Sequence, residues 1–262
     1  MMRSLWSAAS GMRTQQDNMD VVAHNLANVN TYGGKKVRAE FHDLLYQTLR
    51  PAGAESGNDS QYPTGLQIGL GARLAATQRI FTQGSLQATG NPTDLAIEGE
   101  GFFRIEMPDG TIAYTRDGSF KLDQDRRMVT TDGYPIADNI TLEQDATIDS
   151  LTVSQDGRVS DVVNGQQNQI GQITLARFVN PAGLTSIGHN FFLETEASGA
   201  PLEGNPGEDG AGQLQQNVLE MSNVAVVDEM VNMIVAQRAY ESDAKAVTTS
   251  DSMLEIANGL KR

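Results

Sequence analysis

The chain contains no cysteine, and its 262 residues include only one tryptophan, six tyrosines and eight phenylalanines. Without cysteine, disulfide bonds, thiolate metal ligands and a cysteine nucleophile are all excluded. Aromatic residues make up 6% of the chain and hydrophobic residues 39%, which predicts a core that is modest for this length. One or two domains with cores of their own are expected.

Basic residues are also scarce, because 19 lysines and arginines stand against 33 aspartates and glutamates, for a formal net charge of -14. Neither nucleic acid nor an anionic membrane is expected as a partner, since both require a basic patch. No apolar run reaches membrane-spanning length, and Leu5–Ala9 is too short and polar for the core of a secretory signal. We therefore expect either a cytoplasmic protein or export without a cleaved leader.

Residues capable of metal or acid–base chemistry are present but are not grouped in the sequence. His24, His42 and His189 lie far apart, with no partner at metal-ligand spacing. The acids within Asp117–Asp125 lack the ligand spacing and the mid-loop glycine of an EF-hand. The Gly-x-Gly pairs lack the third glycine of a phosphate-binding loop, and there is no G-x-S-x-G motif. No active site, cofactor or metal is expected.

The last forty residues carry the clearest periodic pattern. Positions from Met230 to Leu254 recur at alternating steps of three and four, which indicates a long helix with a coiled-coil seam. Asn223 is predicted to cap this helix, and a second apolar stripe predicts neighbours on two sides. The seam consists of Met230, Met233, Gln237, Tyr240, Ala244, Val247, Asp251 and Leu254, and the second stripe of Val227, Val231, Ile234 and Val235.

The first thirty residues repeat this alternation, and the Asn and Gly residues within 25–34 predict the end of that helix. Two complementary seams at opposite termini predict that the ends meet, within one chain or between chains. Two interpretations follow: a helix pair that closes one globule, or self-assembly through the helices, which we favour. The N-terminal seam consists of Leu5, Ala9, Met12, Gln16, Met19, Ala23 and Leu26.

Between the helical ends, glycines and prolines separate short segments. Their density in residues 50–71 predicts a long ordered loop without regular elements. Residues 35–49 suit either a short amphipathic helix or extended structure, and we favour mixed character. From residue 72 to about 195 the pattern has period two, with Asp-Gly pairs such as Asp109-Gly110 and Asp156-Gly157 at hairpin turns.

These patterns predict an α+β fold with long N- and C-terminal helices forming a coiled-coil-like pair, a Gly/Pro-rich connecting region with an extended loop, and an all-β middle domain. The expected domains are a terminal helical core (1–32 and 222–262), a connecting region (33–71 and 200–221) and a β-rich outer domain (72–199).

Signature motifs occur at both ends and in the middle of the chain. The first signature spans Ser4–Thr31 and contains Ala-His-Asn-Leu-Ala-Asn-Val-Asn-Thr; the last spans Ser222–Val247 and contains Gln-Arg-Ala-Tyr. Between them stand Gly-Glu-Gly-Phe-Phe at 99–103 and Tyr-Thr-Arg-Asp-Gly-Ser-Phe at 114–120. Over essentially its whole length, the chain resembles the rod and hook family of bacterial flagellar axial proteins. Residues 44–48 and 63–71 resemble the extra loop of the distal-rod branch of that family.

The resemblance implies a structural subunit, not an enzyme, that polymerises helically into the distal rod of the flagellar basal body. The rod would be a rigid drive shaft that transmits torque from motor to hook. The implied partners are copies of the chain in a helical tube, axial proteins on the proximal-rod and hook sides, the surrounding ring proteins and the type III export apparatus. The implied location is the periplasmic rod. The alternative from another class is a secreted β-domain adhesin or enzyme with a coiled-coil stalk.

The resemblance also assigns roles to residues outside the helices. Rod-loop contacts between subunits are expected at Pro63, Gly65, Leu66, Ile68 and Gly69. Phe41, Leu44 and Leu45 resemble the family's short export motif, and a buried amphipathic turn is the other interpretation of these three residues.

The lack of metal-ligand spacing and phosphate loops leads to a first testable prediction. Adding Ca²⁺, Zn²⁺ or ATP to the purified protein should leave its Tm unchanged, because only a ligand that prefers the native state raises it. Scanning calorimetry with and without each ligand, and after treatment with a chelator, tests this expectation. A reproducible increase with any of the three would contradict it.

Overall fold

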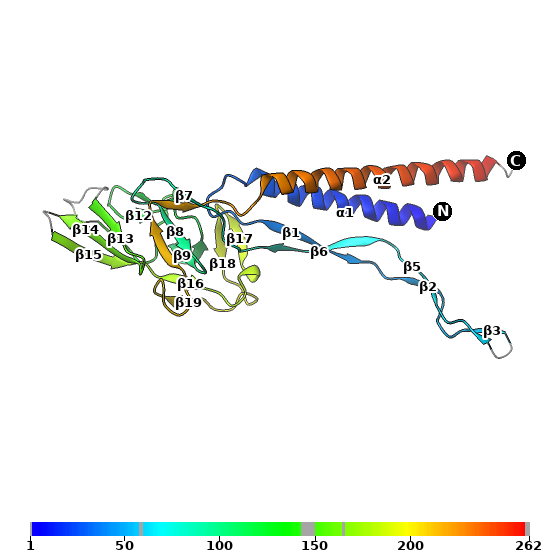
Figure 1. Cartoon of the computed structure of the whole chain (residues 1–262), viewed down its shortest axis with the longest axis horizontal. Coiled ribbons are helices and arrows are strands. Elements are labelled where there is room, and N and C mark those ends of the chain that lie inside the picture. Colours follow the sequence, from blue (N-terminus) through cyan, green and yellow to red (C-terminus); the bar gives the residue numbers. More distant parts are fainter. Residues whose placement is uncertain (1, 58–59, 143–149, 164–165, 260–262) are drawn as a thin grey trace. The chain divides into compact units, whose positions relative to one another are not determined.

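The computed structural model describes residues 2–57, 60–142, 150–163 and 166–259. The chain divides into two compact units. The first unit comprises Met1–Leu26, Val37–Gln78 and Ala225–Arg262, and the second comprises Ala27–Lys36 and Arg79–Val224. Helices α1 (Met2–Ala27) and α2 (Val226–Gly259) belong almost entirely to the first unit, and most of the strands belong to the second (Figure 1).

The long helices at both ends confirm the helical predictions, and α1 ends within the Asn- and Gly-rich segment as expected. The capping role predicted for Asn223 is wrong, because α2 begins at Val226. Asn223 Oδ1 instead accepts a hydrogen bond from the backbone N–H of Lys36 (2.7 Å), and its Nδ2 donates to the carbonyl of Ile80 (2.9 Å). Asn223 therefore joins segments from three distant parts of the second unit.

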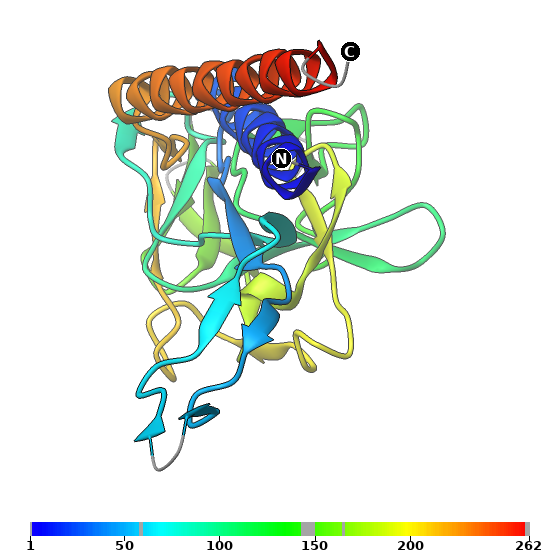
Figure 2. The same cartoon turned by 90° about the vertical axis from the view of Figure 1, so that its right-hand side faces the viewer.

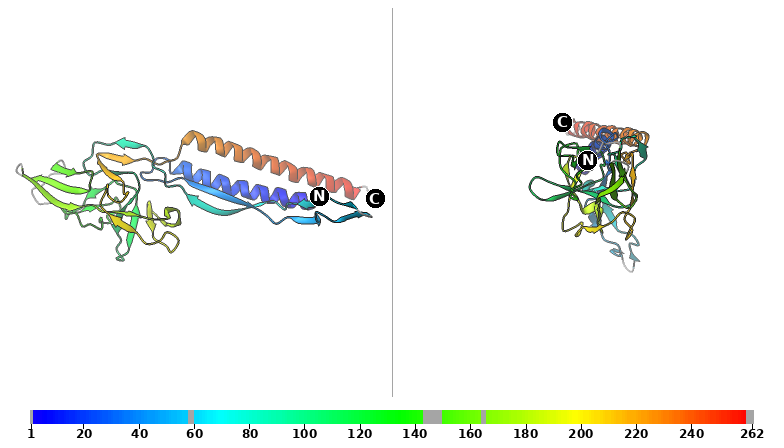
Figure 3. Two further views of the ribbon diagram at one scale, coloured as in Figure 1. Left: turned by 60° about the horizontal axis from the view of Figure 1, so that its bottom comes forward. Right: turned by 90° about the vertical axis from the view of Figure 1, so that its left-hand side faces the viewer.

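Within the first unit, α1 and α2 lie side by side and run antiparallel (Figure 1, Figure 2 and Figure 3). Ser4 Oγ lies 3.3 Å from Ser250 Oγ near one end, and Asn25 Nδ2 donates to Glu229 Oε2 over 3.3 Å near the other. The two contacts are separated by the same number of residues on α1 as on α2, so the register of the antiparallel pair is constant between them.

Small and polar residues occupy the face along which the helices meet. A Cβ atom at Gly11 would lie 2.5 Å from Asp243 Oδ2, so a larger residue there would require the Asp243 carboxylate to move. The buried residues of this face are Ala8, Val22 and Asn25 on α1 and Glu229, Ala236 and Ser250 on α2.

Residues 37–57 and 60–79 form the two arms of a long two-stranded hairpin (Figure 1). Along it, β1 (Val37–Asp43) pairs with β6 (Ala72–Arg79), β2 (Gln47–Arg50) with β5 (Leu66–Ile68), and β3 (Glu55–Gly57) with β4 (Ser60–Gln61). The mixed character favoured for residues 35–49 is therefore wrong, because this segment is extended and contains no helix.

The prediction that residues 50–71 contain no regular elements is wrong. Most of their glycines and prolines stand between the strands, where they do not interrupt the ladder. Near the tip, the backbone N–H of Gly53 donates to the carbonyl of Tyr62 and that of Tyr62 to the carbonyl of Ala54, both at 2.9 Å. The Arg50 guanidinium also lies 3.6 Å from the centre of the Tyr62 ring, a cation–π contact.

An antiparallel six-stranded sheet forms the centre of the second unit. Its turn at Asp109-Gly110, with Gly110 at φ +80°, joins two neighbouring strands and confirms that hairpin prediction. The strands, in spatial order, are β17 (Thr185–Gly188), β18 (Phe191–Leu193), β10 (Ile112–Thr115), β9 (Phe102–Glu106), β16 (Leu175–Arg177) and β19 (Leu202–Gly204).

Successive side chains of a strand point to opposite faces of the sheet. Each face of this sheet is covered by its own hydrophobic cluster. Phe103 and Ile105 of β9 enter the larger hydrophobic cluster, whereas Phe102 enters a smaller aromatic one. Phe191 and Phe192 of β18 divide in the same way. The period-two prediction for residues 102–115 is thereby confirmed.

The other strands of the second unit form smaller sheets. The Asp156-Gly157 pair joins β13 to β14 and confirms the second hairpin prediction. Three two-stranded sheets pair β7 (Leu86–Ala88) with β21 (Val218–Glu220), β8 (Leu95–Glu98) with β20 (Gln213–Gln216), and β11 (Lys121–Leu122) with β12 (Met128–Val129). A three-stranded sheet consists of β13 (Leu151–Val153), β14 (Arg158–Val163) and β15 (Gln166–Gln172). Pro181–Gly183 is a short 3-10 helix.

A buried ionic cluster also lies in the second unit. Lys35 Nζ is 2.6 Å from Glu220 Oε1, with both side chains fully buried, and Arg116 Nη1 is 3.7 Å from Glu220 Oε2. Lys35 Nζ also donates to the carbonyl of Thr82 (2.9 Å), and the backbone N–H of Gly84 donates to Glu220 (2.9 Å). Burial lowers the pKa of Lys35, against the opposing effect of the Glu220 carboxylate.

Glu220→Gln should lower the free energy of unfolding of the second unit by about 3 to 5 kcal/mol, because it leaves two buried cations without their counter-charge. Glu100→Gln is the matched control, since Glu100 pairs with Arg177 at the surface of the same unit, and it should cost less than about 1 kcal/mol. Urea denaturation followed by circular dichroism measures both values. Equal small losses in the two variants would contradict the importance of the cluster.

Candidate assembly interface

The face of α2 that points away from α1 is apolar along its first turns. Because successive helical residues are rotated by about 100°, Val227, Val231 and Ile234 lie opposite the buried Glu229 and Ala236. Val227 is 72% exposed and Val235 61%. We call this exposed surface the outer stripe; it consists of Val227, Met230, Val231, Ile234 and Val235. An uncovered apolar surface of this kind marks a site of protein–protein contact.

The seam predicted on α2 is divided by the contact with α1. Its partly buried members are Met233, Ala244, Val247 and Leu254, and its exposed members are Met230, Gln237, Tyr240 and Asp251. The fully buried positions Glu229, Ala236 and Ser250 each lie one residue before an exposed seam member. The contact within the chain therefore covers one flank of the seam and leaves the other open.

The seam predicted on α1 shows the same displacement by one residue. Ala8, Val22 and Asn25 are buried, each one position before a predicted residue. The predicted Ala9, Gln16 and Ala23 are exposed, and Leu5, Met12, Met19 and Leu26 are partly buried. The role of these residues in contacts between subunits stays a prediction.

The predicted rod-loop residues lie together on one arm of the hairpin. Pro63, Gly65 and Leu66 are exposed, whereas Ile68 and Gly69 are partly buried. A Cβ atom on Gly69 would lie 3.3 Å from the Tyr46 ring of the opposite arm. The exposed residues are thus presented on a paired, backbone-bonded support, and their contacts with neighbours stay a prediction.

Phe41, Leu44 and Leu45 do not form the buried turn considered as the alternative to an export motif. Phe41 lies in β1 and is 39% exposed, and Leu45 follows that strand and is 88% exposed. The Leu44 backbone N–H donates to the carbonyl of Gly71 (2.8 Å), which closes the pairing with the opposite arm. Their role in export stays a prediction.

Asn25 is a positioning residue that sequence periodicity missed. Its Nδ2 donates to the carbonyl of Val37 and its Oδ1 accepts from the Val37 N–H, both at 2.8 Å, in addition to the contact with Glu229. This buried side chain therefore ties together α1, α2 and the start of the hairpin. Its position inside the N-terminal signature motif is the only signal that pointed to it.

The described residues meet neither the requirements of a metal site nor those of a membrane span. Among them, no three His, Asp or Glu side chains gather closely enough to hold a metal ion. No helix in the described part of the chain combines the length and apolar character needed to cross a membrane.

The chain is similar to known proteins at both ends and in the middle. Residues 5–35 match the model "Flagella basal body rod protein", residues 96–161 the "Flagellar hook protein FlgE/F/G D1 domain", and residues 215–260 the "Flagellar basal body rod FlgEFG protein C-terminal". The flagellar basal-body rod protein FlgG of Borreliella burgdorferi is 54% identical over the full length of both chains. That of Buchnera aphidicola is 49% identical over 97% of this chain and 98% of its own.

The chain belongs to the flagellar rod and hook protein family. It is a structural subunit of the distal rod of the flagellar basal body, and not an enzyme. Like the family, the rod subunit self-assembles into a helical axial structure together with other axial proteins. The alternative of an adhesin or enzyme with a coiled-coil stalk is therefore set aside.

Shortening the hairpin should weaken the rod without unfolding the subunit. Ala54 and Tyr62 are hydrogen-bonded neighbours across the hairpin, so replacing residues 55–61 by Asn-Gly closes it with a tight turn. We expect unchanged melting of the second unit and rods that are bent or shorter in negative-stain images, because one layer of contacts is lost. Straight rods of normal length from this variant would show that the hairpin tip does not contribute to contacts between subunits.

Proposed function

We propose that the rod subunit assembles into a rigid shaft that transmits torque from the motor to the hook, with the terminal helices forming the inner core of a helical tube. The observation that carries this proposal is the outer stripe of α2, whose five apolar side chains are between 49% and 72% exposed. Contacts that do not close into a ring build an open filament, and an exposed stripe on a long helix suits such repetition.

In this proposal α1 and α2 act as a coiled-coil-like pair, supported by their constant register from Ser4 to Asn25. Residues 1–32 and 222–262 form the core layer, residues 33–71 and 200–221 the connecting layer, and residues 72–199 the outer layer. Support for a separate outer layer comes from the two hydrophobic clusters, which give the β strands a core of their own. Support for the connecting layer comes from the exposed rod-loop residues Pro63, Gly65 and Leu66.

The partners in this proposal are other copies of the chain, the axial proteins on the proximal-rod and hook sides, and the surrounding ring proteins. The rod would cross the periplasm, and the subunit would reach it through the flagellar export apparatus, with Phe41, Leu44 and Leu45 as part of the export signal. The exposed positions of Phe41 and Leu45 are compatible with recognition by another protein.

Ile234→Asp should abolish rod formation. Ile234 is half-exposed in the single chain, and burying it against a neighbour is worth up to about 1.5 to 3 kcal/mol, whereas an aspartate there would be desolvated without a partner. The critical concentration for assembly should rise more than about tenfold, as measured by sedimentation.

Thr249→Asp is the matched control, because Thr249 is exposed on the same side of α2 beyond the end of the outer stripe. It should assemble as the wild type does. Normal rods from Ile234→Asp, with a wild-type melting profile, would show that the stripe is not an assembly surface.

A further inference from the structure

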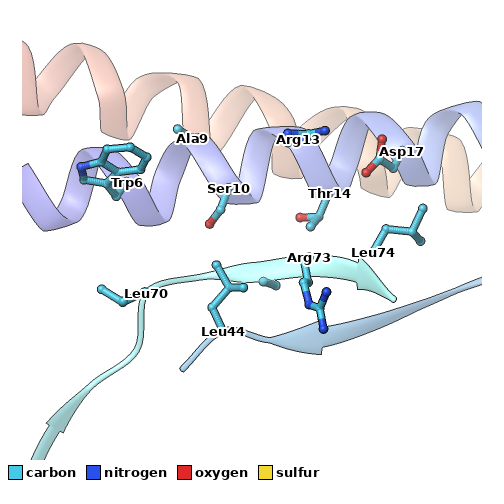
Figure 4. A pocket seen from close by; sticks show the side chains of 11 residues that line it. Trp6, Ala9, Ser10, Arg13, Thr14, Asp17, Leu44, Leu70, Arg73 and Leu74 are labelled. Atoms are coloured by element: carbon cyan, nitrogen blue, oxygen red, sulfur yellow. The ribbon is translucent and has the colours of Figure 1, made fainter. Parts of the chain in front are cut away.

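A groove runs along the side of α1 that faces away from α2, between the helix and the hairpin (Figure 4). Its volume is about 690 Å³, which is enough for several side chains. Trp6 on α1 and Leu44, Leu70 and Leu74 on the hairpin supply apolar walls. Trp6 is 69% exposed, so a large aromatic surface lies open at one end of the groove.

The outer stripe has the form of a ligand for such a groove. Its five residues occupy positions i, i+3, i+4, i+7 and i+8 of a helix, counted from Val227. This is the anchor spacing by which an amphipathic helix lies in an apolar groove. The stripe is also long enough to place anchors along the groove rather than at a single point.

The stripe and the groove of one subunit cannot meet. The two helices pack face to face through Gly11 and Asp243, so the stripe lies on the outside of α2 and the groove on the opposite side of α1. A contact between them therefore requires two copies of the chain. Because the two surfaces differ, such a contact does not close on itself and repeats from copy to copy.

Charged residues of both signs lie at both surfaces. The groove is lined by Arg13, Asp17 and Arg73, two cations and one anion, and within the described part of the chain neither arginine makes an ion pair. The exposed charged residues along the stripe and on the next turns of the same side of α2 are Asp228, Arg238, Glu241 and Lys245, two anions and two cations. The two arginines of the groove can therefore meet Asp228 and Glu241 of a neighbour, and Asp17 can meet one of its cations.

We propose that the outer stripe of one rod subunit occupies the groove between α1 and the hairpin of the next subunit. This head-to-tail contact rests on the proposed self-assembly and names the surfaces that carry it. It also gives the hairpin a second role, as one wall of the site that receives the neighbouring helix.

Two variants of the full chain test the contact from its two sides. Val231→Asp places a charge in the stripe, and Ala9→Gln narrows the groove; both residues are exposed, and neither lies on the face between α1 and α2. Each variant alone should raise the critical concentration for rods by about tenfold or more. Wild-type helicity and melting in each variant, with Thr249→Asp as the assembly-competent control, establish that the fold is intact.

The decisive measurement is an equimolar mixture of the two variants in sedimentation velocity. The Val231→Asp copy retains a working groove and the Ala9→Gln copy a working stripe, so the mixture should form a dimer that cannot grow, whereas each variant alone stays monomeric. Absence of this dimer would overturn the proposal. Assembly by Val231→Asp but not by Ala9→Gln would also overturn it, because another segment, such as a neighbour's hairpin, would then occupy the groove.

The same experiments distinguish a failure of this proposed contact from a failure of the proposed function. Wild-type protein that forms no rods at high concentration would count against self-assembly through these helices. Wild-type rods together with normal rods from Ala9→Gln would count against the groove alone.

Discussion

The ionic cluster of Lys35, Glu220 and Arg116 is the constraint on which the arrangement of the second unit depends. It holds the segment after α1 against the segment before α2. Replacing a buried ion pair with well-packed apolar residues is often neutral or stabilising, so its contribution to net stability is not what distinguishes it. What it provides is a unique pairing, because the Glu220 carboxylate must meet Lys35, Arg116 and the Gly84 backbone together. A slipped arrangement would leave these charges buried and unpaired.

The first unit uses a second polar contact for the same purpose. Asn25 satisfies both backbone groups of Val37 and reaches Glu229 across the helix pair. An apolar residue at either position would permit neighbouring registers of α1 on α2, whereas these directional bonds permit one. Gly11 contributes to this fit, since a Cβ atom there would require the Asp243 carboxylate to move. The two helices are therefore fixed by a few specific contacts rather than by a wide apolar seam.

The sequence predicted which segments form helices and strands better than it predicted which segments contact each other. Period-two alternation identified β9 and β10, and the spacing from Met230 to Leu254 identified α2, because both patterns are local. The spacing could not decide which of two adjacent stripes faces inward, since Ala236 and Gln237 begin equally regular repeats and the choice depends on how closely the helices approach. Asn223 resembled a helix cap because its partners, Lys36 and Ile80, are distant in sequence. The hairpin was missed because its strands are short and separated by the glycines and prolines that predicted a loop.

Helix α2 reverses the usual distribution of side chains on an amphipathic helix. The face covered within the chain carries Glu229, Ala236 and Ser250, whereas the outer stripe exposes valine, isoleucine and methionine to solvent. Apolar burial is the main favourable term in association, at about 25 cal/mol for each Å² removed from water. A subunit that buried these apolar side chains between its own two helices would have little apolar surface available for contacts with neighbours. The polar contacts between α1 and α2 thus set the register of the helix pair. In the proposed assembly, the exposed outer stripe supplies the apolar surface that neighbours bury.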